Sequence, residues 1–171
     1  MNDRQIVDQV FNEYVFTFIE GDIDREIQMA KLSENEVWLG PGKPPRPMGG
    51  GNLLAALGLL CYTEFLGSFI SGKTKGHSRH NFEAFFRRLG SGYEEFATTH
   101  DVYEIFRCGM VHEYAVKRAC TILMVKAAET CGLGVDPEGR YYFVVERYFE
   151  DFKRAVRQLI GELQRKPVLP K

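Results

Sequence analysis

The feature that most constrains the fold is an apolar stretch at residues 53–70, in which only Thr63, Glu64 and Ser68 are polar. A membrane-spanning helix needs roughly 17–25 apolar residues, so this stretch reaches the lower limit. However, a carboxylate at mid-bilayer costs about 2.5–3.5 kcal/mol, and the flanks lack an aromatic belt or a basic stop. We therefore favour a buried central helix of a soluble protein over a transmembrane helix, and we expect no membrane partner.

The composition indicates one globular domain. The chain has 171 residues and is 44% hydrophobic, with 13 Phe and 8 Tyr, which excludes a disordered chain. A net charge of −1 gives no global attraction for nucleic acid or anionic lipid, so such binding would need a local patch. The cysteines form no C-x-x-C pair and the N-terminus shows no secretory signal. We expect a single domain over residues 1–171, cytoplasmic, with reduced thiols and no cofactor.

The periodicity of the first half predicts helices separated by breakers. Apolar residues at three-four spacing predict a helix over residues 6–18 that ends at Gly21, and Asp22 is expected to cap a second helical piece. Residues 40–51 are rich in Pro and Gly and predict a long surface loop, which comes too early in the chain to be a domain boundary. Asn52 is the expected cap of the apolar helix.

The second half adds two helices before a change of pattern. After a breaker stretch at residues 71–78, three Phe on one face predict a short helix over residues 82–89, ended by glycines at 90 and 92. Asp101 is a suitable N-cap for a helix that begins at Val102 and carries the residues discussed below.

The last third predicts a small β-hairpin and a closing helix. Residues 121–125 and 141–145 are β-branched and aromatic, with turn residues at 135–140 between them, although a helix over 115–129 is an alternative. An amphipathic helix over residues 149–163 follows, with Glu150 and Asp151 at its N-terminal end. The expected fold is therefore a mainly α helical bundle with a small β-hairpin before the last helix.

Arg107 and His112 are the candidate chemical pair, in an R-x4-H spacing. A guanidinium can hold a phosphate and an imidazole can move a proton near neutral pH, which together suffice for metal-free RNA cleavage. On an α-helix, a separation of five residues means about 140° of rotation and about 7.5 Å of rise. The two side chains then share no face, unless Arg107 folds back, the helix ends, or a second subunit supplies the partner. The structural alternative pairs Arg107 with Glu104.

Residues 102–114, Val-Tyr-Glu-Ile-Phe-Arg-Cys-Gly-Met-Val-His-Glu-Tyr, resemble the motif helix of the HEPN superfamily (higher eukaryotes and prokaryotes nucleotide-binding). They resemble more narrowly a group of uncharacterised bacterial proteins with a Y-x-x-F-R-N-G-L-x-H-E-Y core. The order of elements over about residues 52–163 is also similar. Arg107 and His112 fall on the motif positions, whereas Cys108 stands where active members usually carry a polar residue, often Asn.

The resemblance implies a dimeric helical bundle in which the R-x4-6-H residues of both subunits lie near one cleft. Many relatives are metal-independent endoribonucleases of toxin–antitoxin, phage-defence or RNA-processing systems, and others are inactive and bind RNA, nucleotides or proteins. We therefore expect a homodimer that acts on or binds RNA, with His112 as the acid/base and Arg107 as the phosphate clamp. A cognate antitoxin is a further expected partner. The alternatives are a non-catalytic interaction or nucleotide-binding module of the same fold, and a bundle that binds a small ligand beside Glu64.

Further candidate binding residues lie in the apolar helix and in the stretch that follows it. Glu64 lies in an apolar helix and needs a partner, for which Arg107 or His112 is suitable, in either a structural or a catalytic pair. His77 and His80 have no carboxylate or thiol at ligand spacing, so we expect no metal site. A cluster of cations indicates either a patch for the RNA backbone or a solvated face; it consists of Lys73, Lys75, Arg79, Arg87 and Arg88.

Overall fold

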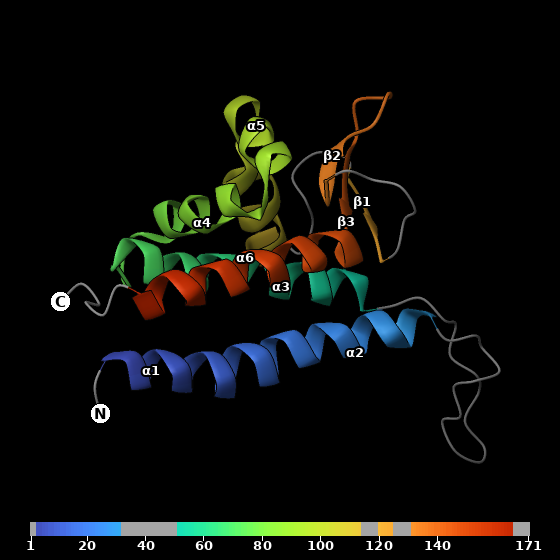
Figure 1. Cartoon of the computed structure of the whole chain (residues 1–171). Helices are drawn as coiled ribbons and strands as arrows, with labels where there is room; N and C mark the ends of the chain where they lie inside the picture. The colour runs from blue at the N-terminus through green and yellow to red at the C-terminus, as the bar shows by residue number, and fades with distance from the viewer. Residues whose placement is uncertain (1–2, 32–50, 114–119, 125–130, 166–171) are drawn as a thin grey trace, which may run out of the picture.

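The computed structural model describes residues 3–31, 51–113, 120–124 and 131–165, with only the backbone for 112 and 113, and it is mainly helical (Figure 1). The mainly α fold with a small β element is therefore confirmed. In chain order the elements are α1 (Asp3–Gln9), η1 (Val10–Ile19), α2 (Glu20–Lys31), α3 (Asn52–Ser71), α4 (Ser78–Phe86), η3 (Arg87–Leu89), α5 (Ser91–Thr99), η4 (Tyr103–Glu113), β1 (Cys120–Leu123), β2 (Leu133–Val135), β3 (Tyr141–Val144) and α6 (Val145–Arg165).

The N-terminal helix does not stop at Gly21, so that prediction was wrong. The segments α1, η1 and α2 follow one another without a break, and η1 is wound as a π-helix. Glycine inside a helix costs only about 1 kcal/mol, and the buried stripe continues beyond it through Ile23 and Ile27. Asp22 pairs with Arg25 at 2.7 Å within the helix and does not cap one. The predicted loop at residues 40–51 lies outside the described residues except for its last glycine.

Helix α3 lies at the centre of the bundle, with the N-terminal helix on one side and α4, η4 and the sheet on the other (Figure 1). It also contacts α6, which runs beside it. Within the described residues it is the one helix whose length and apolarity would allow it to cross a membrane. Part of this helix lies in the core, whereas Leu54 and Phe65 are exposed. Its buried apolar residues are Ala55, Ala56, Leu59, Leu60 and Leu66.

The ends of α3 are set by glycines. Gly51 precedes the helix with a φ of 78° and no side-chain cap, so the prediction that Asn52 caps it was wrong. The Asn52 amide instead donates to the carbonyl of Ile122 at 2.8 Å and ties α3 to β1. Gly72 ends the helix in the left-handed region with a φ of 67°, and its N–H donates to the Ser68 carbonyl.

Helices α3 and α4 pack closely against each other at Gly67. A Cβ atom at Gly67 would lie 1.7 Å from the carbonyl oxygen of Asn81. Asn81 is 3% exposed and its amide donates to the carbonyl of Lys73 at 2.8 Å. The hydroxyl of Ser71 donates to the Asn81 side-chain oxygen. This buried amide therefore fastens the turn after α3 to the first turn of α4.

Two features of the second half differ from prediction. Helix α5, Ser91–Thr99, was not predicted, and the glycine at 92 lies within it. Helix α6 begins at Val145, so Asp151 does not stand at its N-terminal end but lies 1% exposed in its interior. There Asp151 accepts a hydrogen bond from the Tyr93 hydroxyl at 2.8 Å and pairs with Arg147 and Arg154. These three partners satisfy the buried charge.

The N-cap prediction holds, and the predicted β element is present with a different pairing of its strands. The side chain of Asp101 accepts a hydrogen bond from the Glu104 N–H at 3.1 Å, which confirms the N-cap. A small hairpin ending in residues 141–144 is present, but its first strand is β2, with Leu133 opposite Phe143, and not residues 121–125 as predicted. Strand β1 adds to β3 in parallel and gives the order β1-β3-β2.

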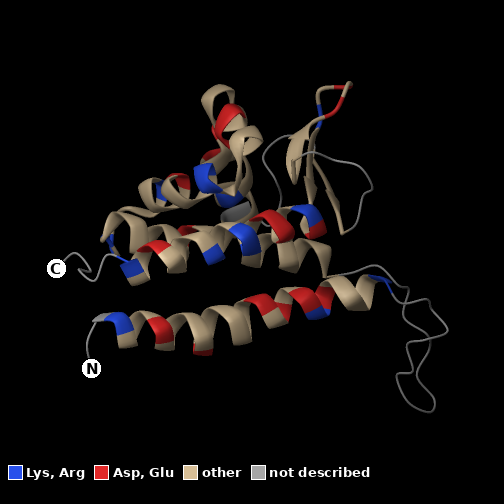
Figure 2. Ribbon diagram, in the orientation of Figure 1, with Lys and Arg blue, Asp and Glu red and all other residues tan. Residues whose placement is uncertain are grey.

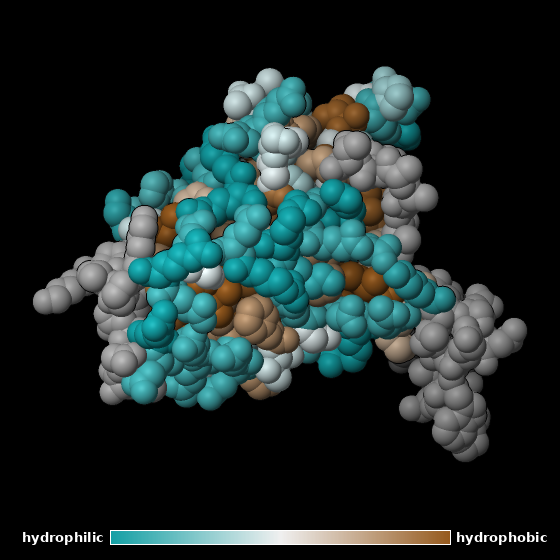
Figure 3. All heavy atoms as spheres, viewed as in Figure 1, coloured by the Kyte–Doolittle hydropathy of each residue, from teal (hydrophilic) through white to brown (hydrophobic). Residues whose placement is uncertain are grey.

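The visible surface is mixed in charge and mostly hydrophilic. Figure 2 shows basic and acidic residues interspersed along α2 and α6. In Figure 3 the face toward the viewer is largely hydrophilic, and hydrophobic residues show mainly in the strip between the N-terminal helix and α6. No single-sign field covers the described helices of this view.

We predict that Gly67→Ala destabilises the protein by about 3 kcal/mol, since an added methyl group there must push α4 away. Gly58→Ala on the same helix is the matched control, because its Cβ would meet only Ile23 and Tyr62 side-chain atoms at 3.4 and 3.5 Å. The control is expected to be neutral or up to about 1 kcal/mol more stable. Urea denaturation measures both, and equal stabilities of the two variants would contradict the close approach.

Candidate functional site

Arg107 on η4 meets Glu64 on α3. Their Nη2 and Oε2 atoms are 2.8 Å apart, and the two side chains are only 15% and 19% exposed. The expected pairing of Glu64 with Arg107 is therefore confirmed. The alternative partner, Glu104, faces Arg79 at 3.7 Å. The single carboxylate of the apolar helix is thus neutralised across the α3–η4 contact, where η4 covers the core.

The ion pair leaves hydrogen-bonding capacity unused. Within the described residues, neither the Nε of Arg107 nor the Oε2 of Glu64 makes a hydrogen bond, although both atoms are buried. Arg107 and Glu64 thus form an ion pair through one contact, and not a bidentate pair with two parallel hydrogen bonds. Of the five N–H donors that a guanidinium carries, the one on Nε is therefore unbonded within the described residues.

Two side chains at helical spacing surround the pair. Cys61 lies one turn before Glu64 on α3, and burial raises the pKa of its thiol while the charge of Arg107 opposes that shift. Tyr103 lies one turn before Arg107 on η4, and burial likewise raises the pKa of its hydroxyl. Both groups therefore stay neutral at pH 7 and can donate hydrogen bonds, but they cannot act as anionic nucleophiles.

Cys108 follows Arg107 on η4 and lies against the side chains of Tyr103 and Glu104. Burial is the main cause that raises the pKa of its thiol, and the carboxylate of Glu104 adds to the shift. A neutral thiol is only a weak hydrogen-bond donor and acceptor. This position therefore contributes little polar support to Arg107.

The winding of η4 changes the expected relation between Arg107 and His112. The helix is wound as a π-helix from Tyr103 to Glu113, with i→i+5 hydrogen bonding. In such a helix, residues five apart lie on successive turns of nearly the same side. The rotation expected for an α-helix, which placed the two residues on different faces, was therefore wrong. The backbone of His112 belongs to η4, whereas its side chain lies outside the described residues.

The five cations of the basic stretch have different surroundings. Arg79 pairs with Asp101 at 2.6 Å and Glu83 at 3.8 Å, and its guanidinium lies 4.9 Å above the Tyr103 ring. Arg88 pairs with Glu162 at 2.8 Å. Two of the five are thus neutralised by carboxylates. Within the described part of the chain the side chains without such a partner are Lys73 and Lys75, in the exposed loop before α4, and Arg87 at the start of η3.

His77 and His80 lie exposed at the start of α4. Among the described residues, no group of three His, Cys, Asp or Glu side chains is arranged to hold a metal ion. The residues that the sequence reasoning missed are Cys61 and Tyr103. Their spacing of three and four residues from Glu64 and Arg107 is the signal that would have identified them, because such neighbours share a helix face.

An apolar groove of about 770 Å³ lies between η1 and α3. Three aromatic residues on its two helices are largely exposed: Tyr14 at 54%, Phe18 at 58% and Phe65 at 41%. Cys61 also lines the groove, so the groove begins beside the Glu64–Arg107 pair. Large exposed aromatic rings gathered in one groove are typical of a surface that another molecule covers.

The comparisons with known proteins give no match: no protein-family model, no curated protein and no solved structure is significantly similar to the chain.

We predict a coupling energy of about 1–3 kcal/mol between Glu64 and Arg107 in a double-mutant cycle of Glu64→Gln and Arg107→Gln, because both side chains are largely withdrawn from water. The exposed pair Arg88–Glu162 is the matched control and should show about 0.2–1 kcal/mol. Thermal or urea unfolding of the single and double variants supplies the free energies. A coupling no larger than that of the control would refute the view that this pair holds η4 on α3.

Proposed function

We propose that the protein is a HEPN-like RNA-binding protein of the cytoplasm and acts as a metal-independent endoribonuclease. The observation that carries the proposal is the largely buried guanidinium of Arg107, which contacts one carboxylate oxygen and whose Nε makes no hydrogen bond within the described residues. The π winding of η4, which brings the backbone of His112 to the same side of the helix one turn later, supports it.

In the proposed reaction, His112 accepts the proton of a ribose 2′-hydroxyl, whose oxygen attacks the adjacent phosphorus. Arg107 stabilises the negative charge that grows on the phosphoryl oxygens. The bond to the 5′-oxygen breaks and that oxygen takes up a proton, leaving a cyclic phosphate and a free 5′-hydroxyl. Glu64 serves as a positioning residue, because its contact fixes the guanidinium on the η4 side of α3.

We predict that the purified protein cleaves single-stranded RNA in the presence of EDTA and that His112→Ala lowers the rate by at least about 10²-fold, as expected for loss of a general acid/base. Arg107→Lys should also lose most activity, because an ammonium cannot grip phosphate in two-pronged fashion. His77→Ala, on the exposed α3–α4 connection, is the control and should cleave like the wild type.

The measurement is gel analysis of a labelled RNA panel, with circular dichroism to check that each variant is folded. Cleavage that survives in folded His112→Ala would remove His112 from the mechanism. An intact RNA panel with the wild-type protein, with and without a genomically adjacent partner protein, would refute the nuclease.

A non-catalytic role of the same fold is the second candidate, and two observations favour it. Cys108 offers a neutral thiol where a polar group would support Arg107. The groove with Tyr14, Phe18 and Phe65 gives the chain an apolar surface for association. In this candidate, the protein is a homodimer that binds RNA, nucleotides or an antitoxin without cleaving RNA.

For both candidates we predict a homodimer that depends on the apolar groove. Phe18→Asp places a charge on the exposed aromatic surface and should shift the protein to monomer by at least about tenfold in Kd, since burying an unpaired charge costs more than 1.4 kcal/mol. Gln28→Glu, an exposed change on α2 outside the groove, is the control. Sedimentation velocity across a concentration series reports the association. A wild-type monomer at high concentration, or an undisturbed Phe18→Asp dimer, would contradict this surface.

A further inference from the structure

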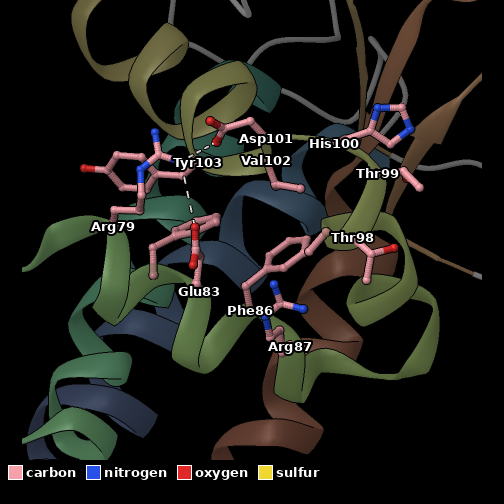
Figure 4. A pocket seen from close by; sticks show the side chains of 12 residues that line it. Arg79, Glu83, Phe86, Arg87, Thr98, Thr99, His100, Asp101, Val102 and Tyr103 are labelled. Atoms are coloured by element: carbon pink, nitrogen blue, oxygen red, sulfur yellow. Dashed lines mark hydrogen bonds and ion pairs between the residues drawn. The ribbon is translucent and has the colours of Figure 1, made fainter.

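A separate polar cavity of about 310 Å³ lies between α4, the end of α5 and the start of η4. Its floor includes Phe82, Phe86 and Val102, which are nearly fully buried. Its rim is polar and carries Arg79, Glu83 and Arg87 from α4 and η3, facing residues 98–101 from the α5–η4 connection (Figure 4). The volume lies at the lower end of the range for small-ligand sites, about 300–1,000 Å³.

The unusual group on the rim is Arg87. Glu83 lies four residues before Arg87, where α4 continues into η3, and an acidic residue that precedes a basic one by four is the favourable order for a helical ion pair. Glu83 nevertheless approaches Arg79 instead, at 3.8 Å. Within the described residues Arg87 makes no ion pair or side-chain hydrogen bond, whereas its neighbours Arg79 and Arg88 both have carboxylate partners. An exposed guanidinium beside a cavity can therefore accept an anionic group of a ligand without breaking a contact.

Glu83 supplies the opposite charge on the same rim. Its contact with Arg79 is longer than a hydrogen bond, and its side chain is 42% exposed. Asp101, in contrast, is occupied by Arg79 at 2.6 Å and by the N–H of Glu104. Figure 4 shows Arg79 turned toward Asp101 and Glu83, which leaves the Glu83 carboxylate as an acceptor with spare capacity at the cavity.

The charges of the rim select the ligand class. Two arginines are balanced by two carboxylates, so the cavity has no excess positive charge that would favour a polyphosphate or an RNA strand. What remains uncompensated is one cation, Arg87, and one partly free anion, Glu83. Their complement is a small molecule with a carboxylate and an ammonium group.

We propose that this cavity binds a free α-amino acid, with its carboxylate on Arg87 and its ammonium group on Glu83. Thr98 and Thr99 line the opposite wall, so the side chain of the amino acid would lie against the end of α5. The site is separate from Glu64–Arg107 and does not depend on the proposed nuclease function. Tyr103 links the two, because it lines the cavity and precedes Arg107 by one turn of η4.

The test is binding of each standard amino acid to the full chain, measured by ligand-observed NMR and then by calorimetry. Inorganic phosphate and adenosine monophosphate serve as anions without this charge pair. At least one amino acid is expected to bind, and Arg87→Gln and Glu83→Gln should each weaken its binding by about tenfold or more. Arg88→Gln is the matched control, because that guanidinium pairs with Glu162 and is absent from the cavity lining.

The folding of each variant is checked by circular dichroism, and Arg87→Lys provides a second charge-preserving variant that should bind better than Arg87→Gln. Failure of every amino acid to bind would overturn the proposal. So would amino-acid binding that is unchanged in both Arg87→Gln and Glu83→Gln. Phosphate that binds more tightly than any amino acid, with no effect of Glu83→Gln, would identify a simple anion site and would also overturn it.

Discussion

The burial of α3 is the constraint on which the rest of the structure depends. Its apolar residues are withdrawn from water where other elements of the fold cover this helix. The N-terminal helix, α4, α6, η4 and β1 all contact it. The closest of these contacts, at Gly67 and Asn81, brings the backbone of α4 so near that only a glycine fits. The turn after α3 and the direction of α4 follow from that approach.

The same helix carries a carboxylate, Glu64, in largely apolar surroundings. Glu64 is 19% exposed on its side chain, and a carboxylate withdrawn from water needs a compensating cation. Arg107 supplies it from η4, so the pair that forms the candidate site also fixes η4 against the core. A structural and a chemical role are compatible here, because the contact uses only part of the guanidinium.

The sequence predicted those parts of the fold that local pattern determines. The apolar helix, the Asp101 cap and the last strand with the turn before it follow from periodicity and turn chemistry, whereas the pairing of residues 121–125 did not. The stop at Gly21 failed because a buried stripe that continues on both sides outweighs one glycine. Helix α5 was missed because residues 91–99 have few apolar positions, with only Tyr93 fully buried. Tyr93 anchors this helix through a hydrogen bond from its hydroxyl to Asp151 on α6, a long-range contact that no local pattern shows.

The sequence likewise predicted some features of the candidate site and missed others. That Glu64 pairs with Arg107 could be inferred from the cost of an isolated charge in an apolar helix. The π winding of η4 could not, because no residue in it is diagnostic of i→i+5 bonding. The neutralisation of Arg79 depends on Asp101 and Glu104, which lie more than twenty residues away in the sequence and approach only because η4 begins beside α4. The sum of charges along the sequence therefore overestimated the net positive charge of the basic stretch.

The contrast between the two arginines on either side of Tyr103 bears on where a phosphate would bind. Arg79 is 47% exposed but faces three carboxylates, so an incoming phosphate would meet a local excess of negative charge. Arg107 is less exposed, yet the described residues oppose it with one carboxylate and leave its Nε unbonded. Electrostatic attraction depends on the uncompensated charge and on the loss of water around it, not on exposure alone. On that physical ground we assign the proposed phosphate contact to Arg107 and not to Arg79, whose pairs with Asp101 and Glu104 hold the start of η4 to α4.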